Sequence, residues 1–307
     1  MTVTVTPTLT VGLPNFGPRP EAGWRQLLDL ARAAEAAGVD RVVVVDHVVM
    51  GRNTHEYAWG PFPYPPEAPW LEPLTVLAAV GAVTERLRLA TGILVAPLRP
   101  AALLAKTAAT VDQLTGGRLD LGVGVGWQRE EFDAVGLDFD RRGELLTDVV
   151  AACRALWEDL PASFSSAAVR FDDTFCAPQP VQARLPVLFS GVLHRRNVDR
   201  IARLGDGWIP IMGASLDEIR AGVDRLRRAL EGAGRDPGAL QVRAPVEVAR
   251  DGGGRPDLDG SMASVPRLVA AGVTDVRVDL RLAPGAADDP AAACGALVEA
   301  FRRHAPA

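Results

Sequence analysis

Lysine is nearly absent from this chain, because Lys106 is the only lysine among 33 basic residues. Schiff-base catalysis needs a reactive lysine in the active site, and Lys106 falls in the middle of a predicted helix, which excludes that chemistry. The four histidines stand apart, with no H-x-H or H-E-x-x-H spacing. A metal hydrolase is therefore excluded, and no metal site is expected. A G-x-S-x-G segment is also absent, which excludes the nucleophile elbow of α/β-hydrolases.

Other features that the sequence lacks limit the cellular compartment and the kinds of partner that we expect. The chain has three scattered cysteines, Cys153, Cys176 and Cys294, which indicates reduced thiols in a cytoplasmic protein and not a disulfide framework. No apolar run approaches the roughly 18 residues of a membrane span, and the first ten residues lack the basic and apolar regions of a signal peptide. A net charge of −5 argues against nucleic acid as the main partner. A small molecule is the partner that we expect.

The chain does contain an alternation of apolar strands and amphipathic helices over its 307 residues. Strands are predicted near residues 10, 43, 91, 122, 187, 208, 244 and 278. Helices are predicted over residues 24–37, 73–84, 99–114, 139–157, 195–204, 216–230, 262–271 and 291–303. Eight such pairs predict an α/β fold, a (β/α)8 TIM barrel in one domain over residues 1–307, with a doubly wound open sheet as the alternative. Residues 159–185, after the fourth strand, form an irregular insertion with a small hairpin.

The most informative stretch runs from Leu87 to Trp127 and predicts strand, helix and strand in a parallel unit buried on both faces. In its second strand, Gly122, Gly124 and Gly126 alternate with leucine and valine, so one face of the strand is almost bare backbone. Either a ligand approaches this face or a tight barrel interior needs small residues there, and we favour the ligand. The glycines do not match G-x-G-x-x-G, so a dinucleotide fingerprint is not indicated.

Asp46 and His47 directly follow the predicted strand at residue 43. Active sites of TIM barrels lie at the carboxyl ends of the strands. An imidazole at such an end can donate to a bound heterocycle or exchange a proton with it. Asp46 could fix the tautomer of His47 indirectly. The alternative is that Asp46 caps the loop and His47 packs on the rim.

Two segments could bind an anion. Ser190-Gly191 precedes the helix that begins at Arg195 and could seat a phosphate on free backbone N–H groups, or it could be an ordinary cap. Arg141 and Arg142 open another helix and could bind anions as well. Surface salt bridges with the acidic residues Asp138, Asp140 and Glu144 are an equal alternative.

A long loop over residues 50–70 is rich in proline, glycine and aromatic residues. A loop of this length in a compact domain is usually functional or disordered. Its aromatic side chains favour a pocket wall or a lid, and they are Tyr57, Trp59, Phe62, Tyr64 and Trp70. An apolar or aromatic substrate suits such a wall.

The order of these segments resembles the luciferase-like monooxygenase superfamily of bacteria, and in particular its branch of F420-dependent oxidoreductases. The resemblance covers residues 9–281. It rests on AEAAGVDRVVVVDHVV, on RRGELL, on ARLGDGWIP and on the long segment LEPLTVLAAVGAVTERLRLATGILVAPLRPAALLAKTAATVDQLTGGRLDLGVGVGWQREEF. It implies a TIM barrel that binds F420, or alternatively FMN, at its C-terminal face, and it implies a homodimer.

The resemblance also implies roles for single residues. Asp46 and His47 would lie at the cofactor, with His47 as the catalytic residue beside its reactive centre. Gly92 and Ile93 would form a cis peptide bond against the cofactor ring. The cofactor tail would meet two loops, which contain Gly124, Gly126 and Trp127 in one and Ser190, Gly191 and Val192 in the other. Trp127 stands where sugar-phosphate dehydrogenases of the branch carry an acidic glutamate, so a sugar phosphate is not the expected substrate.

The leading hypothesis is an F420-dependent oxidoreductase that moves hydride between the deazaflavin and a small organic substrate. The substrate pocket is expected to contain Asn15, Phe16, Trp59, Trp70 and Trp208. One alternative is an FMN-dependent two-component monooxygenase, which needs a separate reductase. Another, from a different class, is a barrel that binds a cofactor or metabolite without turnover.

Overall fold

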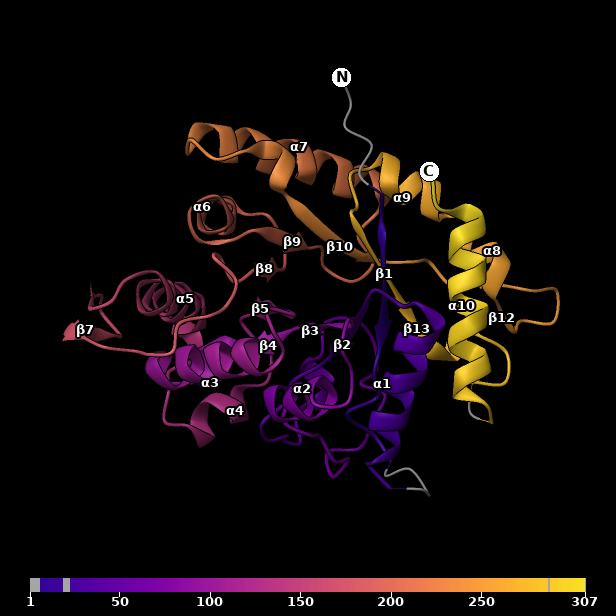
Figure 1. The fold of residues 1–307 in the computed structure, drawn as a ribbon, viewed down its shortest axis with the longest axis horizontal. Coiled ribbons are helices and arrows are strands. Elements are labelled where there is room, and N and C mark those ends of the chain that lie inside the picture. Colours follow the sequence, from indigo (N-terminus) through magenta and orange to yellow (C-terminus); the bar gives the residue numbers. More distant parts are fainter. Residues whose placement is uncertain (1–5, 19–22, 287, 307) are drawn as a thin grey trace.

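The computed structural model describes residues 6–18, 23–286 and 288–306. Residues 1–5 lie outside these ranges. They belong to the ten-residue segment in which no signal peptide is expected. Parallel strands form a closed ring at the centre of the molecule (Figure 1). In chain order they are β1 Thr8–Gly12, β2 Arg41–Val44, β3 Arg88–Thr91 with its continuation β4 Leu94–Val95, β5 Leu119–Gly124, β8 Val187–Ser190, β9 Gly207–Ile209, β10 Gln241–Pro245 and β13 Asp275–Asp279. Strand β1 pairs with β13 and β3 pairs with β5, which closes the ring and confirms the predicted barrel.

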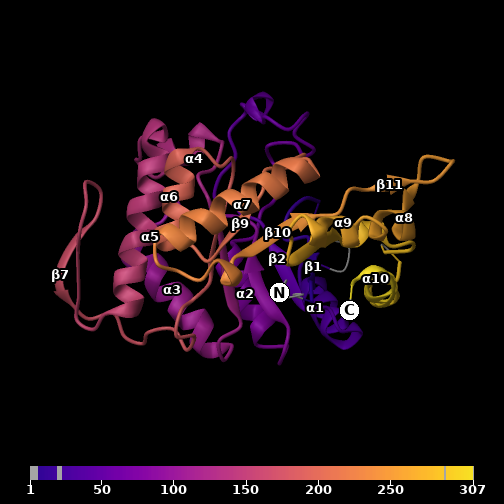
Figure 2. The same ribbon diagram turned by 90° about the horizontal axis from the view of Figure 1, so that it is seen from above.

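Helices cover the outside of the barrel, as Figure 1 shows. They are α1 Gln26–Ala37, α2 Pro73–Gly81, α3 Ala101–Leu114, α5 Arg142–Glu158, α6 Arg195–Leu204, α7 Leu216–Gly232, α9 Val265–Ala270 and α10 Pro290–His304. The last helix, α10, lies beside the first, α1, in both views (Figures 1 and 2). The outward residues of the strands, such as Leu9, Val11, Leu121 and Val276, form one continuous core with these helices.

Two helix predictions need correction. The helix predicted over residues 262–271 begins three residues later, as α9, and a separate short helix that was not predicted, α8 Leu258–Met262, precedes it. Pro266 lies in the first turn of α9 and has no N–H to donate to the preceding turn, so the helix cannot run on from Met262. A short helix that the sequence did not indicate, α4 Arg129–Ala134, follows β5 directly and brings an acidic first turn to the mouth of the barrel.

The remaining elements lie at the periphery. The predicted hairpin exists as β6 Ala162–Ser165 and β7 Arg170–Thr174, and it projects from the edge of the molecule in both views (Figures 1 and 2). Strands β11 Ala249–Arg250 and β12 Pro256–Asp257 form a second hairpin. Short 3-10 turns are η1 Thr54–Glu56, η2 Ala96–Leu98, η3 Phe139–Arg141, η4 Pro237–Ala239 and η5 Leu280–Leu282. In the described ranges, no helix combines the length and the apolar character that crossing a membrane would require.

The inside of the barrel is polar at its base. Arg41 on β2 donates to Asp120 on β5 over 2.7 Å and to Asp275 on β13 over 2.6 Å. Asp275 also accepts from Thr10 on β1 and from Arg243 on β10. The two ion pairs of Arg41 therefore join strands that are one strand apart in the ring, and they are buried.

Candidate active site at the mouth of the barrel

His47 lies just beyond the end of β2, and its imidazole meets a buried carboxylate. Nδ1 of His47 lies 3.1 Å from Oε2 of Glu131, on α4, and the Glu131 side chain is completely buried. The other carboxylate oxygen, Oε1, accepts the backbone N–H of Val48 over 2.7 Å. A carboxylate at this distance favours the proton on Nδ1, where it can be donated. Nε2 makes no hydrogen bond to any residue that the structure describes, so it is the nitrogen available to a ligand.

Asp46 faces away from His47 and serves another purpose. Its carboxylate accepts hydrogen bonds from both terminal nitrogens of Arg99, over 2.7 and 3.1 Å, and from the backbone N–H of Val95 over 2.8 Å. Arg99 reaches on to Glu72 at the start of α2. The expectation that Asp46 fixes the His47 tautomer is wrong, because Glu131 holds that nitrogen. Asp46 instead fixes the end of β2 to the segment that follows β4.

Aromatic side chains surround the imidazole, as the loop over residues 50–70 predicted. The ring centroid of Trp70 lies 4.6 Å from that of His47, edge to face, and Trp127 and Phe62 lie at 5.7 and 6.1 Å. Phe16 stacks on Trp70 at 4.5 Å and is nearly parallel to it. The indole nitrogen of Trp70 is buried without a partner in the described part of the chain. These rings form an apolar wall, and the indole N–H of Trp70 is a buried, unsatisfied donor within the described part of it.

Two residues expected in the substrate pocket do not face it. Asn15 is completely buried, and its side chain bonds the backbone of Val45 and Leu71 at three points. It fastens the loop to β2. Trp208 is buried behind β9, and its indole donates to the carbonyl of Gly191 over 2.8 Å. Trp59 is 40% exposed at the outer edge of the aromatic cluster, where it packs on Tyr57.

The glycines of β5 have two different causes. A Cβ at Gly122 would lie 2.2 Å from the backbone oxygen of Thr91, so this glycine is required by packing inside the barrel. A Cβ at Gly124 would lie 2.9 Å from the side chain of Ile93, beside the Gly92–Ile93 peptide bond, which is cis as the resemblance implies. Gly126 has a φ of +74°. A Cβ at Gly126 would lie 2.7 Å from the side chain of Val95. Ile93 and Val95 thus take the space beside Gly124 and Gly126, so a ligand at the mouth would meet these side chains and not bare backbone.

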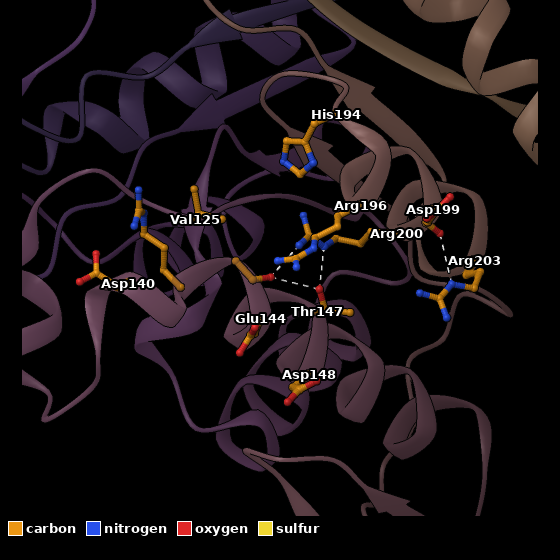
Figure 3. Close-up of a pocket in the computed structure, with 12 residues that line it drawn as sticks. Val125, Asp140, Glu144, Thr147, Asp148, His194, Arg196, Asp199, Arg200 and Arg203 are labelled. Atoms are coloured by element: carbon orange, nitrogen blue, oxygen red, sulfur yellow. Dashed lines mark hydrogen bonds between the residues drawn. The ribbon is translucent and has the colours of Figure 1, made fainter.

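A cavity of about 540 Å³ lies beside this mouth, between α5 and α6 (Figure 3). Arg196 and Arg200 meet near its middle, and Val125, at the end of β5, forms part of its wall. Among the residues that the structure describes, Arg200 donates to neutral oxygens, those of Thr147, Asn197 and Gly143. Burial and the neighbouring Arg196 lower the pKa of the Arg200 guanidinium to about 10. Arg200 makes no ion pair with any residue that the structure describes, although carboxylates also line the cavity, namely Asp140, Glu144, Asp148 and Asp199. A guanidinium in this setting suits an anionic part of a ligand.

The predicted anion-binding segments divide around this cavity. Arg142 contributes to its lining, makes no ion pair in the described ranges and leaves its Nε buried without a partner. Arg141 instead pairs with Glu144 on the surface. The expectation of free N–H groups at Ser190-Gly191 is wrong for Gly191, because its N–H donates to the carbonyl of Ile209. Helix α6 begins at Arg195, as predicted, and its N-cap residue, His194, belongs to the lining of the cavity. Val192 is 59% exposed.

Sequence reasoning did not find Glu131 or Arg200. Glu131 stands in a run of charged residues that looks like an ordinary helix surface, and it is 84 positions from His47. The one hint in the sequence is that two acidic residues, Glu130 and Glu131, follow shortly after the glycine-rich end of a strand. Arg200 lies in a helix with many arginines, and nothing in its spacing separates it from Arg195 or Arg203.

Comparison with known proteins gives a family and a fold. A family model described as luciferase-like monooxygenase matches residues 8–251. An uncharacterized protein of Mycobacterium tuberculosis is 39% identical over 139 residues, 45% of this chain and 49% of that protein. An FMNH2-dependent dimethylsulfone monooxygenase of Pseudomonas putida is 36% identical over 159 residues, 51% of this chain and 43% of that protein. The matches thus span about half the length of these relatives. The structure of an F420-dependent secondary alcohol dehydrogenase, with an F420–acetone adduct, superposes with a TM-score of 0.76 at 18% identity, over 97% of this chain and 99% of that one.

Proposed function

The chain belongs to the luciferase-like monooxygenase family, and on that premise we propose that it is an F420-dependent oxidoreductase acting on a small organic substrate. The observation that carries the proposal is the His47–Glu131 pair, set in an aromatic wall at the mouth of a TIM barrel. Family members are flavin- or F420-dependent oxidoreductases and monooxygenases. The Asp46-His47 sequence favours F420 over FMN, because it resembles the Asp-His pair of the F420-dependent branch.

The residues at the mouth fit a cofactor with an anionic tail and a flat ring. The tail would be held in the cavity between α5 and α6 by Arg142, Arg196 and Arg200, where the orphaned Nε of Arg142 lacks an acceptor. The ring would lie against the Gly92–Ile93 segment at the mouth, where the missing side chain of Gly124 leaves room for that of Ile93. When bound, the deazaflavin would supply the hydride chemistry, and the protein would supply position and electrostatics.

His47 would act on the substrate as a general acid or base. Its Nδ1 proton is held by Glu131, so Nε2 is the atom that would accept a proton from a substrate hydroxyl or donate one to a carbonyl. Glu131 would hold the imidazole ring in this orientation through its contact with Nδ1. Trp70, Trp127 and Phe62 would keep water away and would favour an apolar or aromatic substrate.

One observation favours a second function, an FMN-dependent monooxygenase. The 36% identity to an FMNH2-dependent enzyme covers half of this chain. In that case a separate reductase would supply the reduced flavin. In either case we propose a homodimer in the cytoplasm, where the buried free thiols of Cys153, Cys176 and Cys294 would stay reduced.

Titration of the purified protein with F420 and with FMN, followed by fluorescence, tests the cofactor. Tight binding of F420 alone supports the proposal. Tight binding of FMN alone supports the monooxygenase. Binding of neither contradicts both, and tight binding without turnover over a panel of enones, imines and alcohols would leave a binding protein.

The variant His47→Ala tests the catalytic role. We expect its turnover to fall at least about 100-fold while its cofactor Kd changes less than about threefold, because proton transfer and not binding is lost. His55→Ala is the matched control, since His55 is exposed in η1 on the same loop. Unchanged turnover in His47→Ala would contradict the role.

A further inference from the structure

Helices α2 and α3 lie side by side on the outside of the barrel (Figures 1 and 2), and their outer surface has almost no charge. No residue within α2 is charged, and the charged residues within α3 are Asp112, which is completely buried, and Lys106. Lys106 is half-buried and donates to the backbone carbonyl of Ala177. By contrast, α1, α5, α6, α7 and α10 each carry at least two exposed charged side chains. The surface of α2 and α3 therefore differs from that of the other long helices.

The segment over residues 175–182 widens this surface. It follows α3, because Lys106 binds the carbonyl of Ala177 and Gln113 donates to the carbonyl of Gln179 over 2.8 Å. None of the residues 175–182 is charged. We call the combined surface the α2–α3 face. Its exposed side chains include Ala79, Leu103, Thr110, Leu114, Phe175 and Val181.

The α2–α3 face exposes large apolar side chains. Leu114 is 75% exposed, Phe175 69% and Leu103 60%, which are the three highest values among the large apolar residues of the described ranges. The face is one helix of 14 residues long and two helices and a segment wide, which is about 20 by 25 Å, or on the order of 500 Å². A patch of this size usually marks an interaction site. With its rim it approaches the area of about 800 Å² per partner that is typical of a stable complex.

Charged residues return at the two ends of α2. The side chain of Glu72, before α2, is 44% exposed, and Glu85 and Arg86, after it, are exposed as well. An apolar centre with a polar rim is the usual anatomy of a protein–protein interface. Glu72 also pairs with Arg99, which binds Asp46. The rim therefore includes the outer end of the network that fixes the end of β2.

We propose that a second copy of this chain docks on the α2–α3 face. In a dimer with two-fold symmetry the same face meets itself, so a face that carried several charges of one sign would repel its copy, and this face avoids that repulsion. A lipid surface suits it less, because helices that lie on membranes carry several lysines or arginines beside their apolar side, and the one basic residue within α2 and α3 is bound to Ala177. The inference rests on the homodimer of the proposed function and not on the cofactor or the reaction.

The first test places a charge at the centre of the face. Ala79→Arg would bury an unpaired guanidinium from each copy, so we expect the Kd of the dimer, measured by sedimentation equilibrium, to rise at least about 100-fold. Ala221→Arg is the matched control, because Ala221 is also an exposed alanine inside a helix, α7, and its Kd should change less than about threefold. Arginine is a good helix former, so both variants should keep the circular dichroism of the unmodified protein. Thr110→Arg, on α3, repeats the test if Ala79→Arg does not fold.

The second test locates the contact by chemical modification. The three native cysteines are buried, so a maleimide can follow one new thiol. Leu103→Cys should react at least about tenfold more slowly at concentrations that favour the dimer than after dilution to the monomer, because docking covers the thiol. Val248→Cys is the control, since Val248 is 47% exposed beyond β10, away from the α2–α3 face. Its rate should be the same at both concentrations.

The outcomes separate the inference from the proposed function. An unmodified protein that stays monomeric at about 100 μM would overturn the inference, also if its α2–α3 face proves to bind anionic lipid vesicles. A dimer with unchanged Kd in both Ala79→Arg and Thr110→Arg would overturn it too, and would leave a homodimer formed through another surface. Failure to bind F420 and FMN would contradict the proposed activity alone.

Discussion

The hydrogen bond between Glu131 and His47 assigns different tasks to the two imidazole nitrogens. Nδ1 faces a completely buried carboxylate that also accepts the N–H of Val48. Nε2 is left for the ligand. The chemistry of the site therefore depends on a residue that need not touch the substrate.

The variant Glu131→Gln should reverse this arrangement. The amide oxygen can still accept from Val48, which turns the amide N–H toward Nδ1 of His47, so the neutral imidazole should carry its proton on Nε2. We expect turnover to fall on the order of 100-fold or more, since the wrong tautomer cannot perform the same proton transfer. ¹⁵N NMR of labelled histidine reports the tautomer directly. Asp133→Asn, an exposed position on the same helix, should change neither readout, and an Nδ1 proton in Glu131→Gln would refute the assignment.

Arg200 allows a test of the anion cavity with a simple probe. Inorganic phosphate should raise the Tm of the protein, because an anion relieves the repulsion and the desolvation that lower the pKa of Arg200 to about 10. At about 100 times its Kd a ligand adds about 2.7 kcal/mol. In Arg200→Met the phosphate-induced rise should be largely lost, relative to that variant's own Tm.

Arg195→Met provides the comparison for this measurement. Arg195 opens the same helix, but its side chain is 93% exposed, and Arg195 is not among the residues that line the cavity. Its phosphate-induced rise in Tm should equal that of the unmodified protein. An equal rise in the Arg200 and Arg195 variants would show that phosphate binds elsewhere.

At the scale of elements, Asp46 joins parts of the chain that are far apart in sequence. It holds the end of β2, the N–H of Val95 in β4 and the side chain of Arg99, which itself reaches Glu72 at the start of α2. His47 is the next residue, so this ion pair sets the position of the imidazole. The sequence marked Asp46 as important but not for this reason.

Asp46→Asn should therefore lower both stability and activity. Removing one partner of a buried ion pair costs about 3–5 kcal/mol, and urea unfolding followed by circular dichroism measures it. Glu72→Gln changes the outer, half-exposed end of the same network and should cost about 1 kcal/mol or less. Similar losses in the two variants would show that the inner pair is not the anchor.

Periodicity predicted most elements because each buries one face. All eight barrel strands lie where apolar runs placed them, and α6 and β9 have the predicted bounds. The exceptions have local causes. Helix α4 is only six residues long, too short for a periodic pattern, and the helix predicted over residues 262–271 begins only at Val265, with Pro266 in its first turn. Contacts such as that between His47 and Glu131 arise only when β2 and α4 meet in the folded barrel, so no local pattern encodes them.

At the scale of the whole molecule, the closed ring decides what the glycines of β5 do. Gly122 and Gly124 lie in β5, Gly126 follows it, and all three share one parity in the sequence. Gly122 faces the backbone of Thr91 where β3 and β5 close the ring, whereas Gly124 faces the side chain of Ile93 at the mouth. Alternation identifies the inward face of a strand but not the depth along it. Backbone packing inside the barrel therefore accounts for Gly122, and the side chains of Ile93 and Val95 fill the space beside the two glycines at the mouth.

Closure of the ring depends most visibly on Asp275. Its carboxylate joins β13 to β2 through Arg41, to β10 through Arg243 and to β1 through Thr10. Burial alone would raise the pKa of this carboxyl, but the two guanidinium groups and the Thr10 hydroxyl outweigh burial and lower it. Its contribution to stability is therefore complete above the unfolded pKa of about 3.9 and is lost as the pH falls through the lower folded value.

Asp275→Asn tests this role for the whole barrel. We expect a loss of about 3–5 kcal/mol near neutral pH, because Arg41 and Arg243 lose a shared buried partner. The unmodified protein should lose stability steeply below about pH 4, and the variant less steeply, since one of the carboxylates responsible is gone while Asp120 remains. Urea unfolding at several pH values measures both effects. Asp29→Asn, at an exposed pair with Arg32, should change stability by less than about 1 kcal/mol at any pH. A variant as stable as the unmodified protein would show that the strands close without this carboxylate.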